Sequence, residues 1–165
     1  MSAEAQQRFQ TLHELVKAAK LRLNANIWDY LVGATETETT MQRNRAALDS
    51  IAFRPRVLRD VSKVDCTGDF LGRRRIRLPV ALAPVGSLDS FDPGGAAVAG
   101  RAAAAFGVPI IVSSVTEPGL ERSAEATGTG PKVFQLYVRG GPDDVDEHVR
   151  RAMDAGYDAF AITVD

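Results

Sequence analysis

Polar side chains gather at the ends of four short apolar runs in the second part of the sequence. The runs span residues 79–83, 110–112, 133–138 and 159–164, and a segment of helical character follows each of the first three. In parallel α/β folds the carboxyl ends of the strands lie at one edge, and the groups at that edge carry the function. We therefore expect one site built from the polar groups that end or follow these runs, namely Ser87, Ser113, Ser114, Gln135, Tyr137, Thr163 and Asp165.

Gln135 is the most informative of these residues, because it interrupts a run that should be apolar throughout in a doubly covered parallel strand. An amide buried there without a partner costs about 1–3 kcal/mol, so it needs a partner. Strand alternation places Gln135 and Tyr137 on one face and Phe134 and Leu136 on the other, and it puts Thr163 on a similar polar face. The pattern predicts a barrel interior that faces a ligand. The alternative is a glutamine and a threonine satisfied by internal packing in a core without a ligand.

Side chains that usually supply bases, nucleophiles or metal ligands are scarce in this sequence. His13 and His148 fall on predicted helices away from the predicted edge, so we expect both to be ordinary surface histidines. Cys66 has no cysteine or histidine cluster around it, which argues against a zinc site, and we predict no metal site. The pair Gly94-Gly95 precedes a predicted helix, and a helix start is a better interpretation than an anion site without a longer glycine pattern.

The spacing of apolar residues after Leu78 alternates between strands and helices. Helices are predicted over residues 94–106, 118–126 and 142–155, between the four apolar runs. This order is typical of βαβ units and a parallel sheet. The fold class is therefore α/β, with four parallel strands, and the fourth strand would end at Asp165 with an open edge.

The first part of the sequence has a different organisation. Apolar spacing predicts a helix over residues 4–23. The hydroxyl and carboxylate residues 35–38 are of the kind that cap a helix N-terminus and predict a second helix through about Asp49, with a short aromatic turn at residues 27–31 between the two. Residues 64–71 and 74–78 are predicted to form a small hairpin around Gly72, with the arginines of residues 73–77 on a solvated face. We expect two parts, an N-terminal helical extension over residues 1–63 and a barrel segment over residues 64–165.

Composition excludes several classes of protein. The 165 residues carry 20 Lys+Arg and 21 Asp+Glu, a formal net charge of −1, which argues against nucleic-acid or membrane-surface binding by bulk electrostatics. No apolar run is long enough to span a bilayer, and nothing at the N-terminus resembles a secretory signal. With a single cysteine, no internal disulfide forms, so we expect a cytoplasmic protein.

A collinear series of motifs runs from Ile27 to the last residue. The series contains Trp28-Asp29-Tyr30, Phe53-Arg54-Pro55-Arg56-Val57-Leu58, Leu78-Pro79-Val80-Ala81-Leu82-Ala83-Pro84, Ser113-Ser114, Phe134-Gln135-Leu136-Tyr137 and Thr163-Val164-Asp165. It resembles the FMN-dependent 2-hydroxy acid oxidases and dehydrogenases, which include glycolate oxidase, lactate oxidase and mandelate dehydrogenase. The resemblance covers only the N-terminal half of such an enzyme. It implies a TIM (β/α)8 barrel, of which this chain would hold about the first four strands plus N-terminal helices, with FMN at the carboxyl ends.

The resemblance also implies roles for particular residues. Tyr30 is similar to the family tyrosine that hydrogen-bonds the substrate carboxylate, and Tyr137 to the active-site tyrosine that faces the substrate hydroxyl. The backbone of Pro84, Val85 and Gly86 would lie against the flavin ring. The groups on the heteroatoms of that ring would be Ser113, Gln135 and Thr163. The implied reaction is oxidation of a 2-hydroxy acid by transfer of a hydride equivalent to FMN.

Two departures from the family pattern are local. The family often has Pro-Thr-Ala where this chain has Pro84-Val85-Gly86, a change that matters little where contact is through backbone. Val115 stands where glycolate oxidase has tryptophan after the serine pair, so preference for glycolate or lactate does not follow from any one member.

A larger departure concerns the second half of the family's barrel. The family's catalytic histidine, substrate-binding arginine, flavin-contacting lysine and phosphate-binding loops lie there, so we expect the chain alone to be inactive. Since family members commonly form oligomers, the resemblance also implies that the full-length parent is a homo-oligomer. The alternatives are a non-catalytic half-barrel that assembles with itself or with a separate C-terminal half, and another phosphate-binding barrel such as an FMN-dependent isomerase or an aldolase.

Overall fold

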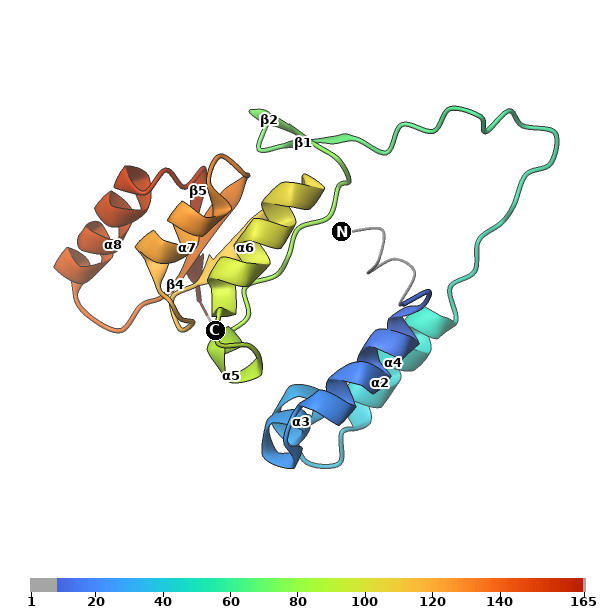
Figure 1. Cartoon of the computed structure of the whole chain (residues 1–165), viewed down its shortest axis with the longest axis horizontal. Coiled ribbons are helices and arrows are strands. Elements are labelled where there is room, and N and C mark those ends of the chain that lie inside the picture. Colours follow the sequence, from blue (N-terminus) through green and yellow to red (C-terminus); the bar gives the residue numbers. More distant parts are fainter. Residues whose placement is uncertain (1–8, 165) are drawn as a thin grey trace. The chain divides into compact units, whose positions relative to one another are not determined.

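The computed structural model describes residues 9–164 of the chain (Figure 1). Contacts divide the chain into two compact units, one formed by residues 11–65 and the other comprising the residues from Cys66 onward together with the N-terminal ten. Each unit is described here by itself. The predicted helix start at residue 4 and the predicted strand end at Asp165 lie outside the described residues. The predicted division into residues 1–63 and 64–165 stays a prediction about the domains of the protein.

The unit of residues 11–65 contains three helices in which no residue is buried. The Thr11 N–H donates to Glu14 Oε2 at 3.2 Å where the first helix begins, and Asn24 Oδ1 accepts from the Ile27 N–H at 3.0 Å where the second begins. The predicted aromatic turn is therefore wrong, because Asn24 caps a second helix that begins at Ala25. The helices are α2 (Leu12–Arg22), α3 (Ala25–Val32) and α4 (Thr39–Asp49).

Helix α4 begins at Thr39, directly after the four predicted capping residues 35–38. Residues 35–38 form a turn, in which the Glu38 N–H donates to the Thr35 carbonyl at 3.0 Å. The Glu38 side chain folds back to accept from the Ala34 N–H at 3.2 Å. These hydroxyl and carboxylate residues therefore shape the approach to the helix and do not form its first turn.

The predicted hairpin is present in a shorter form, as antiparallel strands β1 (Gly68–Phe70) and β2 (Arg74–Ile76). Leu71 and Gly72 both adopt positive φ angles at its turn. The expectation that its arginines are only solvated is wrong for two of them. Arg74 Nε lies 2.6 Å from Asp158 Oδ1 and Arg74 Nη1 donates to the Thr129 carbonyl at 2.7 Å, while Arg77 lies over the Phe106 ring.

Three parallel strands form the sheet of the C-terminal part, in the order β3, β4, β5. The run at residues 79–83 pairs only through one parallel bridge, from Leu82 to Ile110, so it is less regular than the predicted strand. Helices α6, α7 and α8 alternate with the strands and lie beside the sheet (Figure 1). The short helix α5 was not predicted. The elements are α5 (Leu88–Phe91), α6 (Gly95–Phe106), β3 (Ile110–Ser113), α7 (Leu120–Thr127), β4 (Lys132–Tyr137), α8 (Pro142–Asp154) and β5 (Ala159–Thr163).

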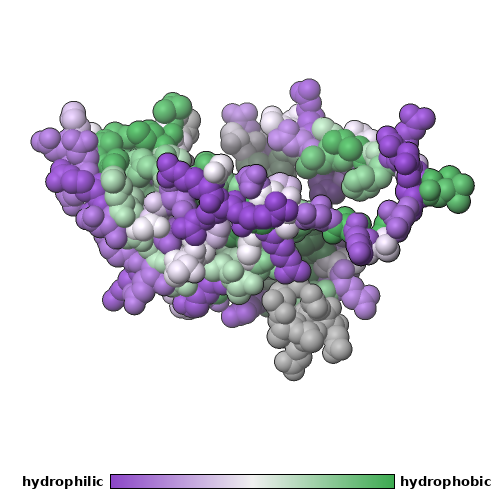
Figure 2. All heavy atoms as spheres, turned by 90° about the horizontal axis from the view of Figure 1, so that it is seen from above, coloured by the Kyte–Doolittle hydropathy of each residue, from purple (hydrophilic) through white to green (hydrophobic). Residues whose placement is uncertain are grey.

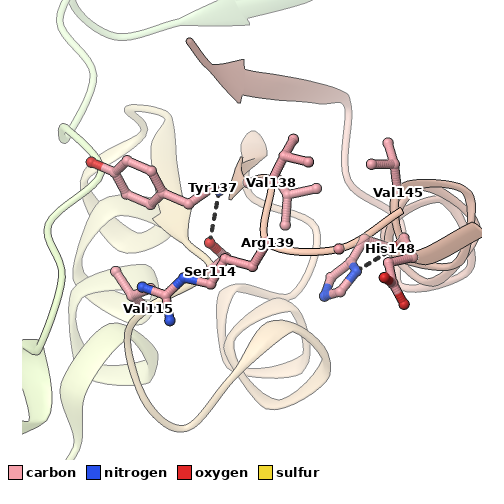
Figure 3. Close-up of a pocket in the computed structure, with 10 residues that line it drawn as sticks. Ser114, Val115, Tyr137, Val138, Arg139, Val145 and His148 are labelled. Carbon is pink, nitrogen blue, oxygen red and sulfur yellow. Dashed lines mark hydrogen bonds between the residues drawn. The ribbon is translucent and has the colours of Figure 1, made fainter. Parts of the chain in front are cut away.

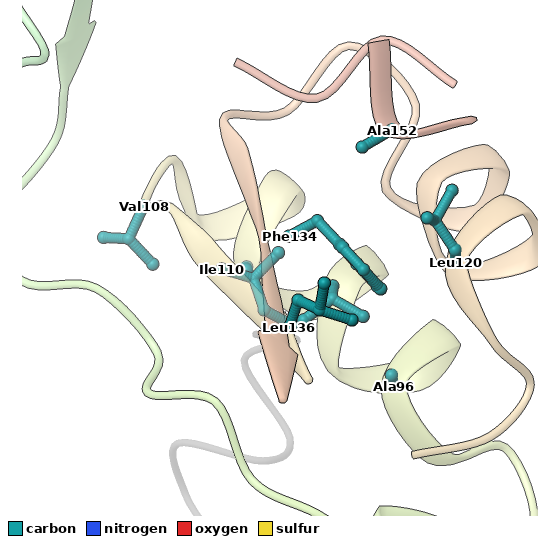
Figure 4. Close-up of a cluster of buried hydrophobic side chains, with 9 residues drawn as sticks. Ala96, Val108, Ile110, Leu120, Phe134, Leu136 and Ala152 are labelled. Atoms are coloured by element: carbon teal, nitrogen blue, oxygen red, sulfur yellow. The ribbon is translucent and has the colours of Figure 1, made fainter. Parts of the chain in front are cut away.

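The hydrophobic core lies between the sheet and its helices (Figure 4). Phe134 is 2% exposed, and its ring centroid lies 5.6 Å from that of Tyr157 and 5.8 Å from that of Phe160. Phe134 and Leu136 are both in this core, so the alternation predicted for β4 is confirmed. The buried core residues are Ala96, Ala103, Val108, Ile110, Val112, Leu120, Phe134, Leu136 and Ala152.

Helices α6 and α7 pack closely because small residues face each other. A Cβ atom at Gly100 would lie 2.2 Å from Thr127 Oγ1, so no side chain fits there without a shift of α7. Thr127 Oγ1 donates to the Ser123 carbonyl at 2.7 Å, which satisfies its hydroxyl inside the contact.

Among the described residues, no helix is long and apolar enough to cross a membrane.

Candidate functional site

The register of the sheet aligns the polar groups at the carboxyl ends of the strands. Ser113 pairs with Gln135, and Tyr137 pairs with Thr163. Strand alternation turns Gln135 and Tyr137 away from the helix-side core that holds Phe134 and Leu136. The polar residues predicted on β3, β4 and β5 therefore lie at one edge of one sheet.

Gln135 is 4% exposed, and its side chain has a protein partner in the next strand. Its Nε2 donates to Thr163 Oγ1 at 2.5 Å. The sequence predicted that this amide needs a partner, and in the structure the partner is Thr163. Part of the polar capacity of both groups is thus used by the protein itself, as the alternative of internal packing anticipates. A threonine hydroxyl can donate to a ligand while it accepts from the amide.

The two serines after β3 have different roles. Ser113 is buried and its Oγ accepts from the Val115 N–H at 3.3 Å. Ser114 connects two strands, because its N–H donates to the Gln135 carbonyl at 2.8 Å and its Oγ accepts from the Tyr137 N–H at 3.1 Å. Ser114 therefore positions the backbone from which the Tyr137 side chain projects.

The segment after the first apolar run lies against the loop that follows β3. The Ser87 N–H donates to the Val115 carbonyl at 2.9 Å. A Cβ atom at Gly86 would lie 3.1 Å from Val115 Cγ2, so glycine lets the two chains approach closely. Pro84 and Val85 are exposed, and their predicted contact with a flavin ring stays a prediction.

A pocket of about 240 Å³ opens beside Tyr137 (Figure 3). It is lined by the loop after β3, the end of β4 and the start of α8. Tyr137 is 40% exposed at its rim. The lining residues are Ser114, Val115, Leu136, Tyr137, Val138, Arg139, Gly140, Asp144, Val145 and His148.

His148 lines this pocket, so the prediction of an ordinary surface histidine away from the edge is wrong. It is half-buried, its ring stacks on Phe134 with centroids 6.3 Å apart, and its Nδ1 lies 2.7 Å from the Asp144 carbonyl oxygen. A carbonyl only accepts, so Nδ1 carries the proton and donates. His148 faces the sheet because it lies three residues after Val145 on the same face of α8, a spacing visible in the sequence.

Arg139 was also missed by the sequence analysis. It follows Tyr137 by two residues in the loop before α8 and is exposed. Its position continues the odd-numbered alternation of Gln135 and Tyr137, which could have indicated that it lies near the site.

The remaining candidates are not on the strands of the sheet. Tyr30 is in α3, which belongs to the unit of residues 11–65, and is 63% exposed; its role toward substrate stays a prediction. His13 is exposed on α2, and Cys66 is exposed with a free thiol.

The start of α6 is not arranged for an anion. The Gly94 N–H donates to Asp92 Oδ1, the Gly95 N–H to the Asp92 carbonyl, and the Ala96 N–H to the Glu117 carbonyl. These amides are already satisfied, so Gly94-Gly95 is a helix start, as expected. Within residues 9–164, no three histidine, cysteine or acidic side chains lie close enough to hold a metal ion.

Comparisons with known proteins agree with this α/β architecture. The family model of the FMN-dependent dehydrogenases matches residues 19–165. Glycolate oxidase 1 of Zea mays is 42% identical over 147 residues, which are 89% of this chain and 39% of that protein. The 4-hydroxymandelate oxidase of Amycolatopsis orientalis is 39% identical over 155 residues, 94% of this chain and 43% of that protein.

A solved structure gives the same result for the fold. The crystal structure of a mandelate oxidase superimposes with a TM-score of 0.88 at 38% identity, covering 95% of this chain and 45% of the other. The chain belongs to the FMN-dependent dehydrogenase family and forms part of a TIM barrel. It spans about two fifths of the length of the curated relatives described above.

The polar groups at the edge fit the cofactor of this FMN-dependent family. The isoalloxazine ring of FMN is planar and carries both hydrogen-bond donors and acceptors. The Ser113 and Thr163 hydroxyls and the Gln135 amide offer both kinds of group from three adjacent strands. This donor set is compatible with the heteroatoms of the ring.

Proposed function

We propose that the protein containing this chain oxidises (S)-2-hydroxy acids to 2-oxo acids with FMN. The observation that carries the proposal is the alignment of Ser113, Gln135, Tyr137 and Thr163 at one strand edge of a chain that belongs to the FMN-dependent dehydrogenases. FMN, when bound, accepts the hydride equivalent removed from carbon 2. The family match favours this oxidation over the isomerase and aldolase alternatives.

Each residue has a separate role in the proposal. Ser113, Gln135 and Thr163 bind the ring heteroatoms, and the backbone of residues 84–86 lies against the ring. Tyr137 hydrogen-bonds the substrate hydroxyl, since its phenol can donate or accept. Tyr30 hydrogen-bonds the substrate carboxylate.

In this proposal a second half of the barrel supplies the histidine that removes the proton and the arginine that binds the substrate carboxylate. Of the two histidines of this chain, His148 stacks on Phe134, on the face of β4 opposite to that of Gln135 and Tyr137. His13 is exposed on α2. We therefore expect the 165-residue chain alone not to oxidise substrate.

The experiment is complementation. The chain is coexpressed with the C-terminal half of a family member, and the purified complex is tested for flavin absorbance and for oxidation of glycolate, lactate and mandelate. A yellow complex that oxidises at least one acid is expected. A soluble, colourless and inactive complex would count against the proposal.

A variant pair makes the test specific to the site. Gln135→Leu removes the amide and should lower the FMN content of the complex. Glu125→Gln, on the exposed face of α7, should leave the content unchanged. Equal FMN content in the two variants would remove Gln135 from the cofactor site.

A second candidate is a non-catalytic half-barrel that assembles with itself or a separate half. The observation that favours it is the exposed helix-side face of β5, where Ile162 is 50% exposed and Val164, two residues later, is 91% exposed.

We also propose a cytoplasmic location for the protein and a homo-oligomeric state for the full-length parent.

A further inference from the structure

The pocket beside Tyr137 contains a cation that the protein leaves without a partner. Arg139 makes no hydrogen bond or ion pair with any residue in the described part of the chain. A guanidinium is a planar cation that offers five N–H donors. A guanidinium without a protein partner at the rim of a pocket can bind an anionic group of a ligand.

The Arg139 side chain reaches toward the candidate site. It runs from the loop after β4 past Ser114 toward Val115 (Figure 3). Val115 is the residue that lies against Gly86, and Ser114 holds the Tyr137 backbone. Arg139 therefore lies at the strand edge that holds Tyr137.

The rest of the pocket limits what can enter. About 240 Å³ is below the 300–1,000 Å³ typical of sites for drug-sized ligands, so the occupant is small. Its walls include the apolar side chains of Val115, Val138 and Val145.

The one carboxylate of the pocket is already engaged. Asp144 Oδ2 accepts from the Gly141 N–H at 2.9 Å, and the Asp144 carbonyl accepts from His148. Asp144 forms no ion pair with Arg139 within the described residues. The guanidinium is therefore available to a carboxylate from outside.

We propose that Arg139 determines specificity by binding a second carboxylate, so that the preferred substrates are 2-hydroxydicarboxylic acids of four or five carbons. This inference rests on the proposed function. The reacting carbon would lie at Tyr137, and the short carbon chain would carry the second carboxylate to the guanidinium. Carboxylate and guanidinium form paired charge-assisted hydrogen bonds, which lysine and neutral side chains do not reproduce.

The test compares two acids that differ only in the terminal group, 2-hydroxyglutarate and 2-hydroxypentanoate. The FMN-loaded protein that contains this chain should have the higher kcat/KM with the dicarboxylate. Arg139→Gln should lower kcat/KM for 2-hydroxyglutarate about 10- to 100-fold, mainly through KM, and change it less than about threefold for 2-hydroxypentanoate. Arg101→Gln, an exposed arginine of α6, is the matched control and should change neither.

Calorimetric titration with 2-oxoglutarate gives a readout independent of turnover. Binding that weakens about 10- to 100-fold in Arg139→Gln but not in Arg101→Gln supports the proposal. Equal binding by the two variants, or equal kcat/KM of the unsubstituted protein for both acids, overturns it. If the proposed function itself is wrong, the protein oxidises neither acid, a result that differs from equal kcat/KM for the two. Binding without oxidation would retain the carboxylate site and reject the reaction.

Discussion

The pair of Gln135 and Thr163 shows how a polar group is accommodated in a parallel strand. The buried amide donates to a hydroxyl at 2.5 Å on the neighbouring strand, so burial of the amide is partly compensated. The same two groups are the predicted flavin ligands. The hydrogen bond therefore holds both predicted ligands in fixed positions before any ligand enters, which would reduce the ordering needed on binding.

This pairing predicts a non-additive effect on stability. Thr163→Val leaves the buried amide of Gln135 without its partner and should lower the free energy of unfolding by about 1–3 kcal/mol. Gln135→Leu with Thr163→Val removes both polar groups, so the double variant should lose less than the sum of the two single variants. Urea unfolding of the three variants measures the coupling. Strictly additive losses would show that the hydrogen bond adds nothing to stability.

The sequence predicted these site residues from strand alternation, since a glutamine in an apolar strand requires a partner. It did not identify the partner, because the register of β4 and β5 that places Thr163 beside Gln135 depends on the whole sheet. His148 was missed although its spacing from Val145 puts both residues on the same face of α8, the face that packs toward Phe134.

Arg74 links the hairpin of β1 and β2 to the sheet. Asp158 Oδ1 accepts from Arg74 and its Oδ2 accepts from the Lys132 N–H at 2.9 Å, at the amino ends of β4 and β5. Lys132 Nζ donates to the Gly128 carbonyl beyond α7, and burial lowers the pKa of this amine. Four elements thus meet at the edge opposite the candidate site.

Arg74→Ala should therefore destabilise the protein by about 1–3 kcal/mol, because the nearly buried Asp158 carboxylate loses its charged partner. Arg73→Ala, an exposed neighbour on the same hairpin, should change the free energy of unfolding by less than about 0.5 kcal/mol. Chemical denaturation of both variants gives the comparison. Equal stabilities would mean that the hairpin is held by other contacts.

Helices α7 and α8 are joined by an ion pair that predicts a pH dependence. Arg151 Nε donates to Glu121 Oε1 at 2.7 Å, which lowers the pKa of this carboxyl below its ordinary value of 4.5. A carboxyl with a lowered pKa in the folded state stabilises the protein above its unfolded pKa. That contribution is lost as pH falls through the folded value. Both side chains are partly exposed, so the effect is small and is screened by salt.

Arg151→Gln should remove this contribution. The stability difference from the unsubstituted protein should be present at about pH 7 and should shrink as the pH falls below the ordinary carboxyl value and Glu121 becomes protonated. Arg150→Gln on the same helix serves as the control, since Arg150 bonds only to the Asp146 carbonyl within the described residues. Urea unfolding across this pH range measures the effect. A difference that persists unchanged at low pH would assign it to packing.

Periodicity predicted α6, α7, α8 and the parallel strands closely, because each has an apolar face that matches its period. It failed at α3, where Asn24 was interpreted as a helix breaker although it caps a new helix. It also failed for Arg74, since charge alone indicated solvent while its partner Asp158 lies far along the chain. Local patterns thus predict elements better than contacts between distant residues.

At the scale of the whole molecule, many large apolar side chains lie on the surface. Figure 2 shows hydrophobic residues in green among the hydrophilic ones. The exposure at β5 is clear from two residues that are partners in the register of the sheet. Leu136 on β4 is 5% exposed beneath the helices, whereas Ile162 on β5 is 50% exposed. Within the described residues, β5 also pairs with β4 alone, so its other edge is free.

A free strand edge beside an apolar face favours association. We expect the 165-residue chain, produced alone, to self-associate in a concentration-dependent way, measured by sedimentation velocity. Ile162→Lys should weaken this association, because a charge on the exposed face would have to be buried in the contact. Met153→Lys, at a 70% exposed position on α8, should leave it unchanged. A complementing C-terminal half should compete with self-association if it covers the same face of β5. Self-association that is equal in both variants and insensitive to the added half would place the contact elsewhere on the molecule.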